Sequence, residues 1–164
     1  MSKGSRFSEK AFSAFSAGFF FILVGCLFLA TPNLLGSIIG FFKDLHIAQV
    51  PNMDVYAPAP AMPRRHTMVY RAFATFSLVW GIFQILVLAL RLGFHSPLNK
   101  KAETFSSVVF WLAACFLTQV FLNEAATLTN WFLFWDAIIM LIGFSLVVRG
   151  LICGFNVYRT FRKG

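Results

Sequence analysis

The chain has 164 residues, of which 59% are hydrophobic and 12% are charged. A soluble globular domain carries about a quarter of its residues as charged side chains, so this composition excludes an ordinary soluble fold. Intrinsic disorder requires low hydrophobicity and is excluded as well. The composition therefore predicts an integral membrane protein.

Long uncharged runs predict where the chain crosses the membrane. A helix needs about 20 mostly apolar residues to cross a hydrocarbon core of about 30 Å, and its backbone must satisfy its own hydrogen bonds there. The runs lack the alternating pattern of a membrane β-barrel. We therefore expect an all-α fold, a bundle of four transmembrane helices that forms a single membrane domain over residues 1–164. Its spans are expected at about 11–30, 67–90, 104–122 and 131–152.

The first uncharged run, between Lys10 and Lys43, has 32 residues and is too long for one span. Thr31 and Pro32 favour a break, because Thr caps helices and Pro suits a first helical turn. Residues 32–45 then place apolar side chains on one face and polar ones on the other. This pattern predicts a short amphipathic helix along the membrane surface or against the bundle. The alternative is one long helix with a kink.

Residues 46–66 form the one long connection between the expected spans, on the outer side. Their prolines predict an extended, polyproline-type path: Pro51, Pro58, Pro60 and Pro63. Apolar residues in the same segment favour an ordered lid over a flexible linker.

The distribution of basic residues predicts the orientation. With four spans, both termini and the loop between the second and third spans lie on one side, which carries ten of the 14 Lys and Arg residues. The positive-inside rule then places both termini in the cytoplasm, and we expect the plasma membrane as the location. The net charge of +8 suits anionic lipid headgroups. No basic surface with interleaved aromatic residues indicates binding to nucleic acid.

Cysteine and histidine residues form no catalytic pattern. Cys26, Cys115 and Cys153 each stand alone in an expected span, whereas a thiol oxidoreductase needs cysteine pairs. His46 and His66 fall on the outer side and are weak candidates for a metal or haem site, with interfacial polar residues as the favoured interpretation. No other catalytic or cofactor motif occurs. We therefore expect no enzyme activity and no cofactor.

Two opposite charges inside the expected spans are the strongest functional signal, because such charges cost a few kcal/mol in lipid. Asp136 lies about 7 Å below the outer end of its span and Arg71 about 6 Å below the outer end of its own. We expect the two residues to face the bundle interior and pair, with Gln119 at the same level and Glu124 at the rim. This intramembrane polar site is interpreted either as an ion vestibule, proton relay or ligand cavity, or as a structural salt bridge, which is favoured.

A second charged cluster is expected at the inner face, where it comprises Arg91, Lys100, Lys101, Glu103 and Arg149. Long basic side chains extend toward headgroups from the ends of spans. Interfacial anchoring is the favoured interpretation, with an ion or lipid-headgroup site as the alternative.

Small residues four apart, such as Ser77 and Gly81, are a weak signal that helix backbones approach closely. Three function classes follow from these features. The first is a small oligomeric channel or transporter that uses the polar site, since four helices enclose little space alone. The second is a non-catalytic accessory or assembly subunit of a larger membrane complex. The third, a membrane redox protein or enzyme, is least favoured. The expected partners are membrane lipids and either further copies of the chain or partner membrane subunits.

Overall fold

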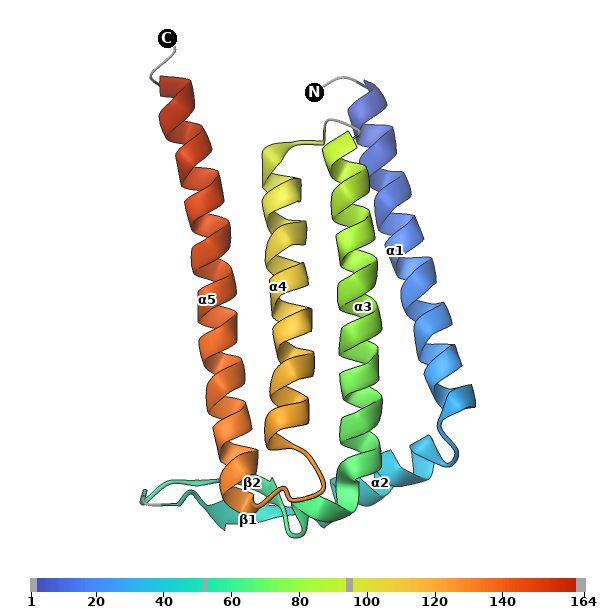
Figure 1. The fold of residues 1–164 in the computed structure, drawn as a ribbon, viewed down its shortest axis with the longest axis vertical. Helices are drawn as coiled ribbons and strands as arrows, with labels where there is room; N and C mark the ends of the chain where they lie inside the picture. Colours follow the sequence, from blue (N-terminus) through green and yellow to red (C-terminus); the bar gives the residue numbers. More distant parts are fainter. Residues whose placement is uncertain (1–2, 52, 94–95, 162–164) are drawn as a thin grey trace.

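The computed structural model describes residues 3–51, 53–93 and 96–161, without the side chains of residues 3–10, 153 and 155–161. The chain is mostly helical (Figure 1). Four helices are long and apolar enough to cross a membrane: α1 (Lys3–Ala30), α3 (Thr67–Gly93), α4 (Leu98–Phe121) and α5 (Leu128–Phe161). The prediction of four spanning helices is confirmed at this level, and these helices are compatible with a membrane location.

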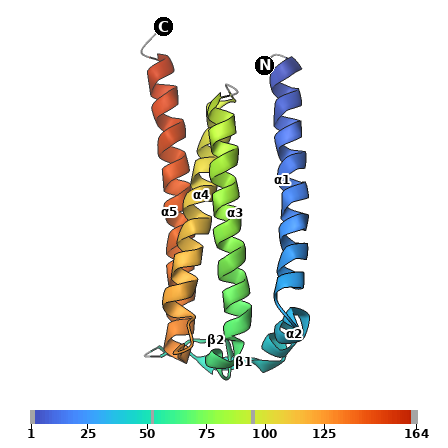
Figure 2. The ribbon, with the colours of Figure 1, turned by 45° about the vertical axis from the view of Figure 1, so that its right-hand side comes forward.

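The four long helices stand side by side in the order α1, α3, α4, α5 (Figure 1). The contact between α3 and α4 is the most extensive, followed by that between α4 and α5, whereas α1 touches α3 over a small area. Figure 2 shows α1 standing apart from the other three helices. Both termini lie at one end of this row, here called the terminal end, and the opposite end is called the hairpin end.

Small side chains hold α3 and α4 together. Ala74, Ser77 and Gly81 are buried on α3, and Ala114, Cys115 and Thr118 are buried on α4. A Cβ atom at Gly81 would lie 2.7 Å from a methyl group of Leu112, so only glycine fits there without a shift of Leu112. Close backbone approach of this kind is a main source of helix association in membranes.

Aromatic rings attach α1 to α3. Phe19 stacks on Phe83 with ring centres 3.9 Å apart, and Phe15 and Phe20 contact rings of the same helix. Most other side chains of α1 are exposed, and Leu23 is buried. One narrow aromatic stripe therefore fixes this helix to the row.

A sharp break separates α1 from α2 (Leu34–Asp44) and produces the separate short helix. The break is centred on Asn33, whose φ of 54° is left-handed, a conformation that Asn tolerates better than most residues. The Ser37 backbone N–H and hydroxyl both donate to the Asn33 carbonyl. Gly36 leaves space for the Asn33 side chain, which a Cβ atom would fill. The helix cap is thus Asn33, two residues beyond the predicted Thr31.

The expected all-α fold and polyproline-type loop need one correction, because the loop contains an antiparallel hairpin. Strands β1 (Leu45–Gln49) and β2 (Tyr56–Pro60) pair with Leu45 opposite Pro60 and Gln49 opposite Tyr56. Pro58 and Pro60 are two residues apart, so their nitrogen atoms face the same edge of β2. A two-stranded ribbon leaves that edge unpaired, where a missing N–H costs nothing. The prolines are therefore compatible with a strand.

The hairpin is followed by a short 3₁₀ helix, η1 (Pro63–His66), and rests on the ends of the long helices. The indole Nε1 of Trp131 donates to the Pro58 carbonyl over 3.2 Å, which joins β2 to α5. Trp131 packs with Phe41 of α2 and Tyr70 of α3, with ring centres about 6 Å apart. This aromatic layer lies beneath the hairpin and joins four elements.

Candidate functional site

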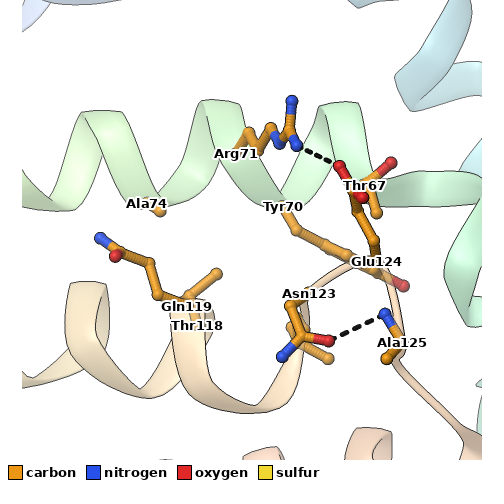
Figure 3. A pocket seen from close by; sticks show the side chains of 10 residues that line it. Thr67, Tyr70, Arg71, Ala74, Thr118, Gln119, Asn123, Glu124 and Ala125 are labelled. Atoms are coloured by element: carbon orange, nitrogen blue, oxygen red, sulfur yellow. Dashed lines mark hydrogen bonds and ion pairs between the residues drawn. The ribbon is translucent and has the colours of Figure 1, made fainter.

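A cavity of about 510 Å³ opens at the hairpin end between α3 and α4 (Figure 3). Arg71, Gln119 and Glu124, three members of the predicted intramembrane polar site, line it. The remaining lining residues are Thr67, Tyr70, Ala74, Thr118, Leu122, Asn123 and Ala125. The structure thus brings together residues that lie more than 40 positions apart in the sequence.

Arg71 forms an ion pair with Glu124, which the loop between α4 and α5 presents to it (Figure 3). The Asn123 side-chain carbonyl accepts a hydrogen bond from the Ala125 backbone N–H over 2.9 Å and so shapes this loop. The side chains of Arg71 and Glu124 are 74% and 77% exposed, so the pair lies at the rim of the cavity. The expected pairing of Arg71 with Asp136 is not formed: Arg71 pairs with the loop residue Glu124, and Asp136 lines another cavity.

Polar groups also lie on the cavity wall. Gln119 Nε2 lies 3.2 Å from Cys115 Sγ, and the Thr118 hydroxyl donates to the Ala114 carbonyl. Tyr70 is 4% exposed, and its hydroxyl has no hydrogen-bond partner among the described residues. The cavity therefore offers donors and acceptors beside an apolar wall, as a small polar ligand or water would need.

Asp136 lies elsewhere, on an exposed side of α5. It lines a separate cavity of about 620 Å³ between α5 and the hairpin. Within the described part of the chain it has neither a hydrogen bond nor an ion pair. The prediction that Asp136 faces the interior of the bundle is wrong, since α5 turns its other side toward α4.

The predicted inner-face cluster gathers at the terminal end. Arg91 donates to the Lys100 carbonyl over 2.9 Å and to the Thr104 hydroxyl, which joins the end of α3 to the start of α4. Lys100 also pairs with Glu103 at 2.9 Å. Lys101 follows in the first turn of α4, and Arg149 is exposed on α5. Arg91, Lys100 and Glu103 are therefore in one network.

A second cavity, of about 410 Å³, lies beside this network. Ser13 and Ser16 of α1 and Gln84 of α3 line it together with charged residues of α3 and α4. Polar side chains thus extend from the terminal end into the apolar part of the row.

The two histidines His46 and His66, weak candidates for a metal or haem site, do not meet. His46 lies in β1 opposite Ala59, whereas His66 Nε2 donates to Asp44 Oδ2 over 2.8 Å. The hydrogen bonds from His66 and from the Met62 backbone N–H hold the pKa of Asp44 below its usual value. Groups of three His, Cys, Asp or Glu residues that could hold a metal are absent from the described residues. Cys26 and Cys115 are free thiols in separate helices, and the Cys153 side chain lies outside the described residues.

Sequence reasoning missed two of these contributors. Tyr70 reads as an ordinary apolar residue of α3, although its place one residue before Arg71 put it near the polar site. Asp44 reads as the polar end of the amphipathic helix. Its role depends on the hairpin, which brings the Met62 backbone N–H back to the Asp44 carboxylate, and no local sequence pattern predicts this contact.

Comparison with known proteins gives no relative. The chain matches no protein-family model, no curated protein and no solved structure. A functional assignment therefore depends on the geometry of the chain itself.

Proposed function

We propose that this protein is a non-catalytic subunit of a larger membrane assembly, which packs through the exposed face of α5. One observation carries the proposal: Asp136 stands on an exposed, otherwise apolar face of a candidate membrane span and has no partner among the described residues. Ionisable residues inside a membrane usually face a bundle interior or a cavity and pair with another group. A neighbouring chain would supply that interior.

The exposed apolar side chains of the four long helices are weaker support for an assembly than Asp136 is. In the most apolar stretch of α1, 6% of the residues are buried, against 28–33% in the other three spans. Lipid tails cover apolar side chains as well as another protein does, so this exposure is compatible with a monomer. A carboxylate differs, because lipid tails cannot replace its hydration.

The proposed orientation places both termini in the cytoplasm and the hairpin outside, in the plasma membrane. Its support is the excess of Lys and Arg at the terminal end. Cysteines introduced singly in the hairpin and treated with an impermeant thiol reagent test it, because only an external hairpin reacts in intact cells.

Purification of the tagged full-length chain from its own cells in a mild detergent tests the proposed function. We expect a particle with a protein mass well above 18.5 kDa and a fixed stoichiometry of chains, measured by native mass spectrometry. Asp136→Asn should weaken this particle, whereas Glu124→Gln, another acidic residue at the hairpin end, should leave it intact. A monodisperse monomer in several mild detergents would contradict the proposal.

A second candidate is a small channel or transporter, which the two polar cavities favour. They open at opposite ends of the α3–α4 pair, one lined by Gln119 and the other by Gln84. About 15 Å of α3 separates Ala74 in the first cavity from Gln84 in the second, and Ser77 and Gly81 lie between them. Ion flux into vesicles that contain the protein tests this candidate, with Gln84→Leu expected to abolish any flux and Gln49→Leu in the hairpin as the control.

A further inference from the structure

The exposed face of α5 carries one carboxylate, that of Asp136, among apolar side chains. Trp131, Ile138 and Leu141 are buried. At about 100° per residue, Asp136 lies about 200° around the helix from Ile138, which places it on the side opposite the buried one. Beyond the hairpin this face continues with Ile139, Met140, Gly143, Val147 and Gly150, all of which are exposed. Phe132, one turn nearer the hairpin on the same face, is buried. One carboxylate therefore stands near the hairpin end of an apolar stripe.

The hairpin tip overhangs this face. In Figure 1 the tip reaches past α5 on the side away from α4. Val50, Pro51, Met53 and Val55 of the tip, with Leu133 and Trp135 of α5 among others, line the cavity of about 620 Å³ that contains Asp136. Asp136 is the one charged residue among the described residues that line it. The cavity under the overhang and the exposed stripe that continues from it along α5 are together called the α5 groove, which the hairpin covers at one end.

The charge indicates the chemistry of the occupant. Asp136 lies about 12 Å along α5 from Leu128, and apolar side chains surround it. A positive group at the same depth would compensate the carboxylate, and opposite charges within a membrane often pair with each other. The groove therefore fits an apolar partner that carries one cation.

The glycines indicate the shape of the occupant. Gly143 and Gly150 lie seven and 14 residues after Asp136 on the same face, and nothing lies within 4 Å of a Cβ atom at either position. Small residues repeated along one face let a second helix backbone approach closely, with a crossing angle of about 20°. A lipid with an ammonium headgroup would neutralise Asp136 but would gain nothing from this spacing.

A second copy of the chain fits less well. The basic residues described at the hairpin end are Lys43, Arg64, Arg65 and Arg71. Lys43 lies in α2, and Arg64 and Arg65 lie in η1, so Arg71 is the one within a long helix. Glu124 already pairs with Arg71. A second copy that used Arg71 would exchange one ion pair for another, whereas a partner with its own cation would gain a new pair at Asp136.

Building on the proposed function, we infer that the α5 groove binds a transmembrane helix of a different polypeptide, which carries a lysine or arginine at the depth of Asp136. The carboxylate sets the register of the two helices, Gly143 and Gly150 allow close contact, and the hairpin tip covers the outer end of the incoming helix. Association of this kind is the physical basis by which the subunit joins its assembly.

Synthetic helices test the inference with the full-length chain in phosphatidylcholine vesicles. One peptide is a 23-residue Leu/Ala helix with a single Lys at position 8 and a photoreactive leucine beside it. The matched peptide has Gln in place of Lys. Cross-links to α5 are mapped by mass spectrometry, and circular dichroism confirms that each variant remains helical. We expect the Lys peptide to give about tenfold more cross-links than the Gln peptide, since polar contacts in membranes contribute 1–2 kcal/mol.

Three variants separate the contributions. Asp136→Asn should abolish the preference for Lys, Gly143→Leu should reduce cross-linking of both peptides, and Glu124→Gln should change neither. Equal cross-linking by the two peptides, or a preference that survives Asp136→Asn, would overturn the inference. Cross-links between copies of the chain without peptide, lost in Asp136→Asn, would overturn it in favour of a second copy. The peptide assay tests the α5 groove and needs no native complex, whereas purification from cells tests whether the protein is a subunit of an assembly. A failure of one proposal is therefore recognised independently of the other.

Discussion

Asp44 and His66 form a hydrogen bond of 2.8 Å that joins the end of α2 to the end of η1, directly before α3. Asp44 also accepts the Met62 backbone N–H through its side chain and the Ala61 backbone N–H through its carbonyl. One residue therefore fixes both ends of the segment that contains the hairpin. Because the hairpin forms the roof of the α5 groove, this pair positions the proposed binding face.

Replacement of Asp44 by Ala should destabilise the hairpin end. The change removes the carboxylate that accepts hydrogen bonds from His66 Nε2 and the Met62 backbone N–H, and it leaves the buried His66 ring without this acceptor. The loss should lower the free energy of unfolding by about 1–3 kcal/mol. Thermal unfolding in detergent micelles, followed by circular dichroism, measures the effect. Asp54→Ala is the matched control, because Asp54 accepts only a 3.3 Å hydrogen bond from Gln49 at the exposed tip. Equal losses in the two variants would contradict this role of Asp44.

The same pair predicts the acid sensitivity of the hairpin end. The hydrogen bonds from His66 and Met62 lower the pKa of Asp44 in the folded protein below its ordinary value of 3.8. Its stabilising contribution is therefore complete above about pH 4 and is lost as the pH falls through the lower, folded-state pKa. Melting temperatures measured from pH 2.5 to 6 should fall below pH 4 in the native protein. This part of the fall should be absent from Asp44→Ala, and an identical profile would rule out Asp44 as the group responsible.

The contact of Gly81 with Leu112 predicts a specific cost for a single methyl group. Gly81→Ala places a Cβ atom 2.7 Å from the Leu112 side chain, which must move, and overpacking of this kind costs about 1–3 kcal/mol. Gly143→Ala is the control, since nothing lies within 4 Å of a Cβ atom there. In a Leu112→Ala background the penalty at Gly81 should shrink, as a double-mutant cycle in micelles would show. If Gly81→Ala cost as much in the Leu112→Ala background as in the native chain, the added methyl group would clash with a residue other than Leu112.

Residue patterns alone predicted the long helices, because a membrane span is set by local composition. The apolar runs at Ala11–Ala30, which has no charge, and Leu128–Ile152, which has two, are long enough to require helices in lipid. The break after Ala30 was also predicted from Pro32, although the cap is Asn33. The pairing of β1 with β2 was not predicted, because prolines considered alone favour an extended, unpaired path.

The polar site was predicted only in part, and rotation explains why. The depth of a residue follows from counting along a helix, so Arg71 and Gln119 were expected near one level, and in the structure they line one cavity. The face toward which a residue points depends on which side of its helix packs. Apolar residues occur on every side of α5, so no pattern indicated that Asp136 points away from the other helices. Nor does it say which acidic residue reaches Arg71, since Glu124 lies in a loop.

The ion pair of Arg71 with Glu124 should contribute little to stability despite its position in the cavity. Both side chains are largely exposed, and exposed pairs contribute about 0.2–1 kcal/mol. A double-mutant cycle of Arg71→Ala and Glu124→Ala, measured by thermal unfolding in micelles at low and high salt, should give a coupling energy in this range that decreases with salt. A coupling above about 3 kcal/mol would mean that the pair is buried in the assembled protein.

Trp131 should control the attachment of the hairpin to α5. Its indole Nε1 donates to the Pro58 carbonyl, and the ring is 6% exposed within the aromatic layer. Trp131→Phe keeps most of the packing and removes the donor, so the free energy of unfolding should fall by about 1 kcal/mol and the hairpin amides should exchange faster with solvent. Trp131→Ala also removes the packing and should cost about 3–5 kcal/mol. Trp135→Phe, at a ring that is 47% exposed, is the control and should leave the amide exchange of β1 and β2 unchanged. Equal exchange rates in Trp131→Phe and the native chain would show that the hairpin is held by other contacts, and the roof of the α5 groove would then not depend on this bond.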